Sequence, residues 1–300
     1  MTNSADSRAP RPASTALNPT SGFLTGFTHS LQTYIGCRFG CAYCYVQESN
    51  VHRFFNGGFA WGEYAYPRQG VADRLVQELE RYRRKGCLDS LAIFCSSSTD
   101  PYQGAEREWQ LTRRCLEAFV AAPPGLLVIQ TRSPLVERDF DLLSSLGDRC
   151  WLSMTLETDR DDVRQALTPH CPSIERRLAT IRAARVAGLN VQVAVSPCLP
   201  YSGVEDFGGL LLEVGQRVVV DSYTSGDGLG GKRTARTEIP AEYARLGWGD
   251  WQAEDAARSL YTSGCTNGWT SASAGPRQGL QTWPVGSQPR RLAEQSHLIT

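Results

Sequence analysis

The sequence predicts an α/β fold: a partial (β/α)6, TIM-like barrel of parallel strands with an irregular C-terminal extension. Short apolar runs typical of buried strands alternate with stretches of helical spacing and make six strand-helix units up to residue 222. The chain has 300 residues, a length at which α/β barrels commonly form one domain. Because helical crossovers join parallel strands, their carboxyl ends meet at one edge, where we expect the chemistry.

Each strand is predicted from a short apolar run bounded by polar or turn-forming residues. The runs lie at about 28–34, 91–95, 126–130, 151–156, 190–195 and 217–220. The helices between them are predicted from helical spacing, seen in the first helix at Val71, Leu75, Leu79 and Tyr82. Their expected ranges are 71–82, 108–121, 137–146, 173–187 and 204–214. Gly188 follows the fourth helix and is placed to end it.

Composition divides the chain into three parts. Residues 1–22 are rich in Ser, Thr, Ala and Pro and contain no apolar run, so we expect a disordered tail and no signal peptide. We expect residues 23–222 to form the barrel and residues 223–300 a loop-rich C-terminal extension. The extension contains a glycine-rich stretch at 225–237 and four tryptophans. It is either a flexible loop or a substrate lid, with cations for an anionic substrate at Lys232, Arg233 and Arg236.

Charge and cysteine content narrow the function classes. Lys plus Arg and Asp plus Glu number 31 each, so the whole chain gives no electrostatic sign of a nucleic-acid partner. No apolar segment is long enough to span a bilayer, and we expect no membrane partner. The ten cysteines follow no compact disulfide framework. Reduced thiols and a cytoplasmic location are therefore expected.

Three of the cysteines form a C-x₃-C-x₂-C run at Cys37, Cys41 and Cys44. A structural zinc site needs four protein ligands, and an electron-transfer [4Fe-4S] cube needs four thiolates. Three thiolates leave one iron of a cube open to a substrate or cofactor. Two alternatives stay open: a chance cluster of reduced cysteines, or a zinc site completed by the distant His52 or Cys87.

Polar residues follow the predicted strands at the edge where their carboxyl ends meet. The second strand leads into Ser-Ser-Ser-Thr-Asp-Pro-Tyr at 96–102 and the third into Thr-Arg-Ser-Pro at 131–134. The fourth contains Ser153 and leads to Glu157, and the fifth ends in Ser-Pro-Cys-Leu-Pro at 196–200. Each motif alone is an ordinary turn, but their repetition on one edge favours a functional site.

These strings together resemble the radical SAM superfamily, in its spore photoproduct lyase-like branch. The resemblance is carried by the cysteine run, the strings at 97–103 and 130–134, Arg-Gln-Ala-Leu-Thr-Pro at 164–169, and Ser-Pro-Cys-Leu-Pro, and it covers about residues 27–201. It implies that the three cysteines hold a [4Fe-4S] cluster whose open iron binds S-adenosylmethionine. It also implies contacts to that cofactor: Tyr43 near the adenine, Ser97 and Thr99 near the methionine amine, Arg132 and Ser133 near the carboxylate, and Ser153 near the ribose.

The function implied by the resemblance is reductive cleavage of S-adenosylmethionine to a 5′-deoxyadenosyl radical, which abstracts hydrogen from an unidentified substrate. An electron donor such as flavodoxin or ferredoxin is expected, and a nucleotide or nucleic acid is one substrate class. A DNA-lesion lyase of the spore photoproduct type is one alternative, with Cys95 or, less favoured, Cys198 as a hydrogen-atom donor unless each merely packs in the core. A non-catalytic iron–sulfur or zinc sensor or scaffold is the other.

Overall fold

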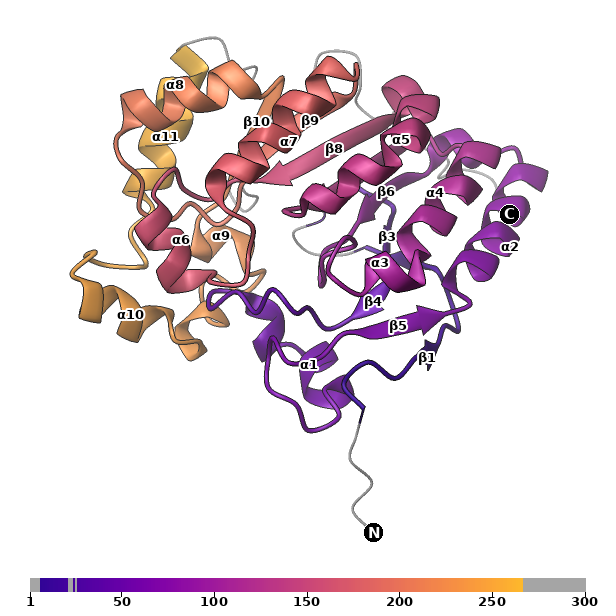
Figure 1. Cartoon of the computed structure of the whole chain (residues 1–300), viewed down its shortest axis with the longest axis horizontal. Helices are drawn as coiled ribbons and strands as arrows, with labels where there is room; N and C mark the ends of the chain where they lie inside the picture. Colours follow the sequence, from indigo (N-terminus) through magenta and orange to yellow (C-terminus); the bar gives the residue numbers. More distant parts are fainter. Residues whose placement is uncertain (1–5, 21–23, 25, 267–300) are drawn as a thin grey trace, which may run out of the picture.

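The computed structural model describes residues 6–20, 24 and 26–266, and its centre is a seven-stranded sheet of order β10-β9-β8-β7-β6-β3-β2 (Figure 1). Six strands run parallel: β3 (His29–Leu31), β6 (Ala92–Cys95), β7 (Leu126–Thr131), β8 (Cys150–Thr155), β9 (Asn190–Val195) and β10 (Arg217–Val220). β2 (Leu17–Pro19) pairs antiparallel to β3. Over the described residues the sheet stays open between β10 and β2, so the expected partial barrel is confirmed.

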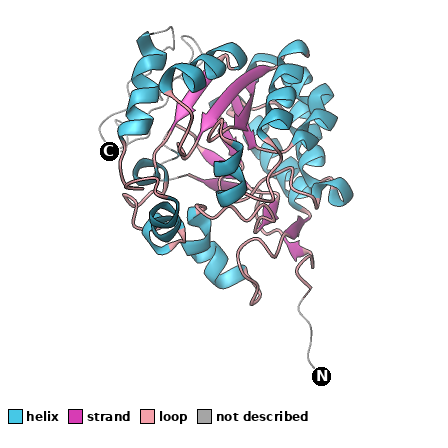
Figure 2. Cartoon of the chain, turned by 60° about the vertical axis from the view of Figure 1, so that its left-hand side comes forward, coloured by secondary structure: helices cyan, strands magenta, loops and turns pink. Residues whose placement is uncertain are grey.

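Helices cover the outer side of this sheet, as Figure 2 shows. They are α2 (Val71–Arg84), α4 (Leu111–Ala121), α5 (Phe140–Leu146), α7 (Ile174–Val186) and α8 (Val204–Val214). The helix expected at 108–121 begins later, because Gln110 has a φ of +49° and separates α4 from the short α3 (Glu106–Trp109). The helix expected at 137–146 is a 3-10 helix, η4 (Pro134–Asp139), followed by α5.

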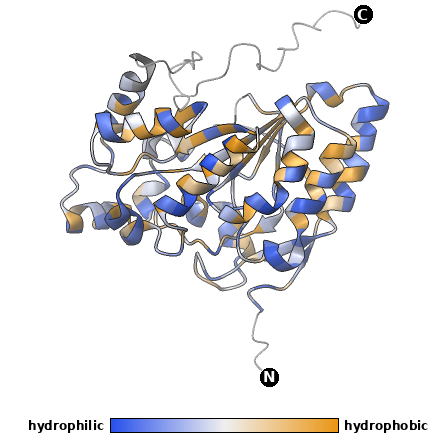
Figure 3. Ribbon diagram, turned by 45° about the horizontal axis from the view of Figure 1, so that its top comes forward, coloured by the Kyte–Doolittle hydropathy of each residue, from blue (hydrophilic) through white to orange (hydrophobic). Residues whose placement is uncertain are grey.

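Side chains alternate strictly between the two faces of the sheet. On β7, Leu127 and Ile129 pack into the large core under the helices, while Leu126 and Val128 belong to a separate apolar cluster on the inner face. The other parallel strands follow the same period of two. The strands are mostly hydrophobic, and hydrophilic residues alternate with hydrophobic ones along the helices (Figure 3).

The N-terminal segment differs from the expected disordered tail. Within residues 6–20, β1 (Arg11–Pro12) pairs with β5 (Tyr66–Gln69), which in turn pairs with β4 (Tyr34–Ile35). The Glu78 carboxylate also accepts hydrogen bonds from the backbone N–H groups of Ala16 at 3.0 Å and Leu17 at 2.8 Å. Backbone pairing orders this segment, and composition does not report backbone pairing. Residues 1–5, 21 and 22 lie outside the described part.

The described part of the C-terminal extension is helical and packs on the barrel. It contains α9 (Tyr223–Gly226), η6 (Thr234–Arg236), α10 (Ile239–Leu246) and α11 (Asp255–Thr266). Leu260 of α11 is fully buried in the main core. The segment up to residue 266 therefore differs from the expected loop-rich extension, while Trp269 and Trp283 lie outside the described residues.

The remaining elements are short. They are η2 (Tyr45–Glu48), α1 (Asn50–Phe55), η3 (Leu88–Ser90), η5 (Gly147–Arg149) and α6 (Asp161–Leu167). α6 matters for the site, because the backbone N–H of Ala42 in the cysteine loop donates to the Leu167 carbonyl at its end, at 2.9 Å. Across the described residues, no helix is long and apolar enough to cross a bilayer.

Candidate functional site

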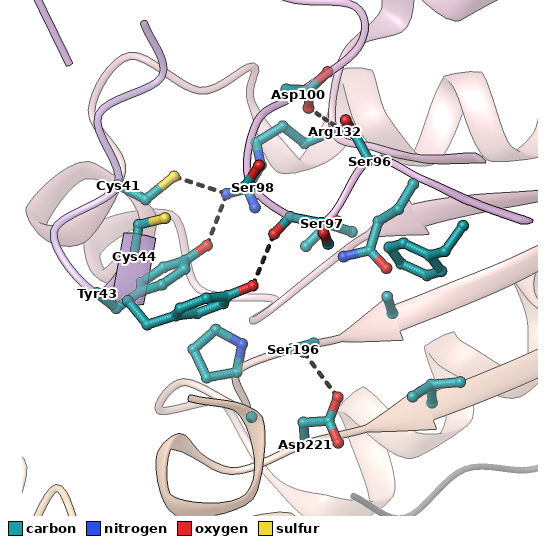
Figure 4. A pocket seen from close by; sticks show the side chains of 18 of the residues that line it. Cys41, Tyr43, Cys44, Ser96, Ser97, Ser98, Asp100, Arg132, Ser196 and Asp221 are labelled. Carbon is teal, nitrogen blue, oxygen red and sulfur yellow. Dashed lines mark hydrogen bonds between the residues drawn. The ribbon is translucent and has the colours of Figure 1, made fainter. Parts of the chain in front are cut away.

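A cavity of about 180 Å³ lies on the inner face of the sheet and reaches its carboxyl edge. Its walls come from the cysteine loop, the ends of β6 and β7, the inner faces of β9 and β10, and the segment after β10. Figure 4 shows Cys41 and Cys44 on one side and Ser196 with Asp221 across from them. The expected gathering of polar residues at this edge is therefore present.

All three cysteines of the run line this cavity. Gly36 and Gly40 have φ values of +83° and +56°, and a Cβ on Gly36 would come within 2.3 Å of Tyr64 Cε2. The loop therefore requires glycine at position 36 for both backbone conformation and space. Thr99 fixes the loop to the strand end, because its Oγ1 donates to the Gly36 carbonyl at 2.5 Å.

The chemistry of the donor set fits an iron–sulfur cube. A cube takes one thiolate per iron, and the loop brings three cysteines to one cavity. Among the described residues, no group of three or more His, Cys, Asp or Glu side chains is spaced to hold one metal ion. His52 bonds to the Tyr64 hydroxyl at 3.0 Å, Cys87 is exposed, and neither lines the cavity. The structure thus gives no support to a zinc site completed by either residue.

A buried charge network joins the cysteine loop to β7, β8 and α7. Arg132 Nη1 donates to Cys41 Sγ at 3.0 Å, to the Tyr43 hydroxyl at 2.7 Å and to Glu157 Oε1 at 2.7 Å. Arg177 Nη1 donates to the other oxygen of Glu157 at 2.6 Å, and the Tyr43 hydroxyl also bonds to Glu157. Burial acts to raise the pKa of Glu157, but the two guanidinium groups outweigh it and lower that pKa to about 2. The carboxylate is therefore charged and holds Arg132 and Tyr43 in place.

The structure brings together four of the six residues expected to contact the cofactor. Tyr43, Ser97, Thr99 and Arg132 all line the cavity. Ser97 is held by Gln32, whose Nε2 donates to its Oγ at 2.8 Å.

Two other expected cofactor residues do not line the cavity. Ser133 is buried as the N-cap of η4, where its Oγ accepts from the backbone N–H of Leu135 at 3.3 Å. Ser153 is fully buried, and its Oγ accepts from Nε2 of Gln192, which does line the cavity. Thr155, two residues further along the inner face of β8, is the lining hydroxyl of that strand.

Neither candidate hydrogen-atom donor lines the cavity. On β6, Phe94 and Ser96 face the cavity, and Cys95 packs into the core beneath the helices. Because strand side chains alternate, the residue between two inner positions points outward. Cys198 is likewise buried in that core. The packing alternative therefore describes both cysteines in this structure.

One cysteine beside the site was missed in the sequence. Cys171 follows α6, and its Sγ lies 3.7 Å from Cys41 Sγ. The hydrogen bond with Cys41 is the largest influence lowering the pKa of Cys171, to about 7, and it raises that of Cys41. The only signal in the sequence was its position two residues after the string at 164–169.

The far wall of the cavity consists of residues in matching positions on β9 and β10. Gln192 pairs with Arg217 in register, followed two residues on by Ala194 with Val219, and all four line the cavity. At the edge above them Ser196 donates to Asp221 at 3.0 Å, and burial raises the pKa of Asp221 to about 6. This wall was missed too, although the alternation of β9 and β10 was the signal that could have found it.

The glycine-rich stretch is an anchored loop. The buried carboxylate of Asp227 accepts backbone hydrogen bonds from Leu229 at 2.7 Å, Gly231 at 2.9 Å and Arg233 at 2.8 Å. The lining residues from this stretch are Gly226, Asp227 and Thr234, and Lys232, Arg233 and Arg236 are not among them. The structure therefore gives no support to a lid whose cations reach the cavity.

Comparison with known proteins gives one family and several uncharacterized relatives. The family model described as the radical SAM superfamily matches residues 31–214. An uncharacterized protein of Acidianus two-tailed virus is 33% identical over 59% of this chain and 58% of its own length. An uncharacterized protein of Methanocaldococcus jannaschii is 27% identical over 61% and 64%. The chain thus spans less than two thirds of the length of these relatives.

Solved structures of spore photoproduct lyase share the fold. One complexed with a dinucleoside spore photoproduct has a TM-score of 0.55 at 15% identity and covers 75% of this chain and 65% of its own. A mutant lyase has the same TM-score and identity over 71% and 60%. At this identity the likeness concerns the fold. Since the family model spans more than half of the sequence, the chain belongs to the radical SAM superfamily.

Proposed function

We propose that this chain is an enzyme that binds a [4Fe-4S] cluster through Cys37, Cys41 and Cys44. When bound, the cluster and S-adenosylmethionine supply reductive cleavage of the sulfonium and a 5′-deoxyadenosyl radical that abstracts hydrogen from a substrate. The observation that carries the proposal is that the three cysteines share one cavity with the inner face of β9 and β10. A cofactor at the loop therefore opens directly onto a space for substrate.

The side chains around the loop would orient the cofactor. Tyr43 is fixed by its hydroxyl between Arg132 and Glu157, so its ring has one position beside the cysteines. Ser97 and Thr99 offer hydroxyls at the strand end next to the loop, as the methionine amine would need. Arg132 lines the cavity beside the cysteine loop and stays our candidate for the carboxylate, with Glu157 holding its guanidinium.

The part of the cavity against the inner face of the sheet would hold the substrate and keep water out. Phe94, Val128, Ala194 and Val219 line its inner face, with Leu24 and Phe27 beside them. Because the radical chemistry that the cofactor would supply is reactive toward many C–H bonds, these side chains would have to exclude water and hold one substrate C–H bond in position. An external one-electron donor such as flavodoxin or ferredoxin would reduce the cluster.

Our proposal does not favour a DNA lesion over other substrates. A spore photoproduct lyase of similar fold was solved in complex with a dinucleoside spore photoproduct, but that ligand is known for that protein and not for this chain. In this chain the cysteine at the end of β6, Cys95, faces the core and not the cavity. The substrate in our proposal is accordingly left unassigned within the hydrogen-abstraction class.

Anaerobic reconstitution tests the proposal. Iron and sulfide should give a brown protein with about four irons per chain that converts S-adenosylmethionine to methionine and 5′-deoxyadenosine under dithionite. Cys44→Ala should lose both properties, and Cys87→Ser, which changes an exposed cysteine away from the cavity, should keep both. A colourless protein that retains zinc through the same treatment would overturn the proposal.

A further inference from the structure

Two cysteines that are 130 residues apart in the sequence meet at the edge of the cysteine loop. Cys41 Sγ and Cys171 Sγ are 3.7 Å apart, and each residue is 5% exposed. The segments that carry them are also tied by the hydrogen bond from Ala42 N–H to the Leu167 carbonyl. Both sulfurs lie in the same apolar cluster as Tyr43. Packing and backbone contacts thus hold this sulfur pair together.

We propose that Cys41 and Cys171 are a modification site, at which a disulfide forms when the protein has lost its cluster and meets a peroxide. A disulfide has an S–S distance of about 2.05 Å, so the two sulfurs must approach by about 1.7 Å from their present 3.7 Å. That Cys41 is a cluster ligand rests on the proposed function, whereas the contact between the sulfurs does not.

The chemistry balances with hydrogen peroxide as the oxidant. One of the two thiols is oxidised to a sulfenic acid, and the first water leaves. The sulfur of the other cysteine then attacks the oxidised sulfur, the S–S bond forms and the S–O bond breaks. The departing oxygen takes the thiol proton of the attacking cysteine and leaves as a second water. Two electrons have then passed from the two thiols to the peroxide.

The disulfide would both block and protect the cluster site. It removes Cys41 from the ligand set, so a cluster cannot be rebuilt until a thiol reductant restores the thiol. It also stops oxidation at a reversible stage, because a sulfenic acid without a partner proceeds to the irreversible sulfinic acid. Cys37 and Cys44 are the competing partners in the same loop.

The test uses the full chain after anaerobic removal of iron. Metal-free protein receives one equivalent of hydrogen peroxide, free thiols are alkylated, and the unreduced digest is analysed by mass spectrometry. We expect the main cross-linked peptide to join Cys41 to Cys171. Dithiothreitol should then restore iron binding to the level of untreated protein. A main link from Cys41 to Cys37 or Cys44, or an unlinked Cys41, would overturn the proposal.

The variant Cys171→Ser distinguishes a role in protecting Cys41 from oxidation from a role as a cluster ligand. Without peroxide this variant should take up as much iron as the unchanged chain, because Cys171 is not a ligand in our proposal. After an excess of peroxide, since a sulfinic acid consumes two molecules per thiol, and then dithiothreitol, its iron content should be several-fold lower than that of the unchanged chain treated in the same way, with sulfinic acid at Cys41. Cys198→Ser, which changes a buried cysteine that does not line the cavity, should behave like the unchanged chain. Equal iron recovery in Cys171→Ser and the unchanged chain would contradict the protective role. Should the chain bind no cluster at all, the proposed function fails while the cross-link measurement still decides the pairing.

Discussion

Replacing Arg132 with alanine in the metal-free protein tests the buried charge network beside the cysteine loop. The carboxylate of Glu157, 1% exposed, accepts from Arg132 at 2.7 Å and from Arg177 at 2.6 Å. Because Arg177 and Tyr43 remain, the carboxylate loses one charge-assisted hydrogen bond and stays paired. We expect the free energy of unfolding at pH 7 to fall by about 1.5–3 kcal/mol. Removing the sole partner of a buried charge would cost more, about 3–5 kcal/mol.

The pH dependence of the stability difference provides a second, independent test of this prediction. The pKa of Glu157 is lowered from 4.5 to about 2: burial acts to raise it, and Arg132 and Arg177 outweigh burial. A carboxyl with a lowered folded-state pKa stabilises the fold above its unfolded pKa, and that stabilisation is lost as the pH falls through the folded pKa. Without Arg132 the folded pKa rises, so the variant has less of this contribution to lose. The stability difference should therefore be largest at pH 7 and shrink between pH 4.5 and 2.

Urea unfolding followed by circular dichroism at pH 7 and at about pH 3.5 measures both quantities. Arg176→Ala is the matched control, because Arg176 pairs with Glu137 at 2.7 Å with its side chain 46% exposed. That change should cost less than about 1 kcal/mol at either pH. The reasoning is refuted if Arg132→Ala costs less than about 0.5 kcal/mol, or if its cost is the same at both pH values.

Three further predictions follow from the cavity. Replacing any one of Cys37, Cys41 and Cys44 with alanine should abolish S-adenosylmethionine cleavage and leave the circular dichroism spectrum of the barrel unchanged. If cleavage is retained, that cysteine is not a ligand. Arg132→Ala should weaken S-adenosylmethionine binding by about 1.5–3 kcal/mol in calorimetry with iron content unchanged; an unaltered Kd would count against the carboxylate contact. Cys95→Ala should cost about 1 kcal/mol in urea unfolding and leave the product profile normal by mass spectrometry, because Cys95 packs under the helices; abnormal products would restore it as a donor.

Elements whose burial shows in the sequence were predictable. The run at 190–195 and the helix at 204–214 have in the structure the bounds expected from apolar pattern. The pattern failed where the backbone decides. The positive φ at Gln110 splits one helix from its first turn, and β1 forms by pairing with β5 although its residues are exposed. Neither event leaves a periodic signal.

Only those parts of the candidate site whose residues are close together in the sequence could be predicted. The cysteine run lies within eight residues and could be recognised as one ligand set. Glu157 follows β8 and Arg177 lies on α7, and the pairing of Glu157 with both Arg132 and Arg177 depends on how those elements pack. Cys171 meets Cys41 for the same reason. Helical spacing from Ile174 and Ile181 places Arg177 on the buried face of α7, but a single sequence does not say which residue Arg177 contacts there.

The alternation of side chains along the strands could have predicted more of the cavity lining from the sequence. On β7, Val128 and Gln130 face the cavity. The same parity applied to β6 places Phe94 and Ser96 inside and Cys95 outside. A hydrogen-atom donor must reach the substrate, so parity alone argues against Cys95. In β10 it selects Arg217, Val219 and Asp221, which form the far wall opposite the cysteines. An apolar run therefore supports two predictions. Its length predicts a buried strand, and the alternation along it predicts which side chains line the cavity.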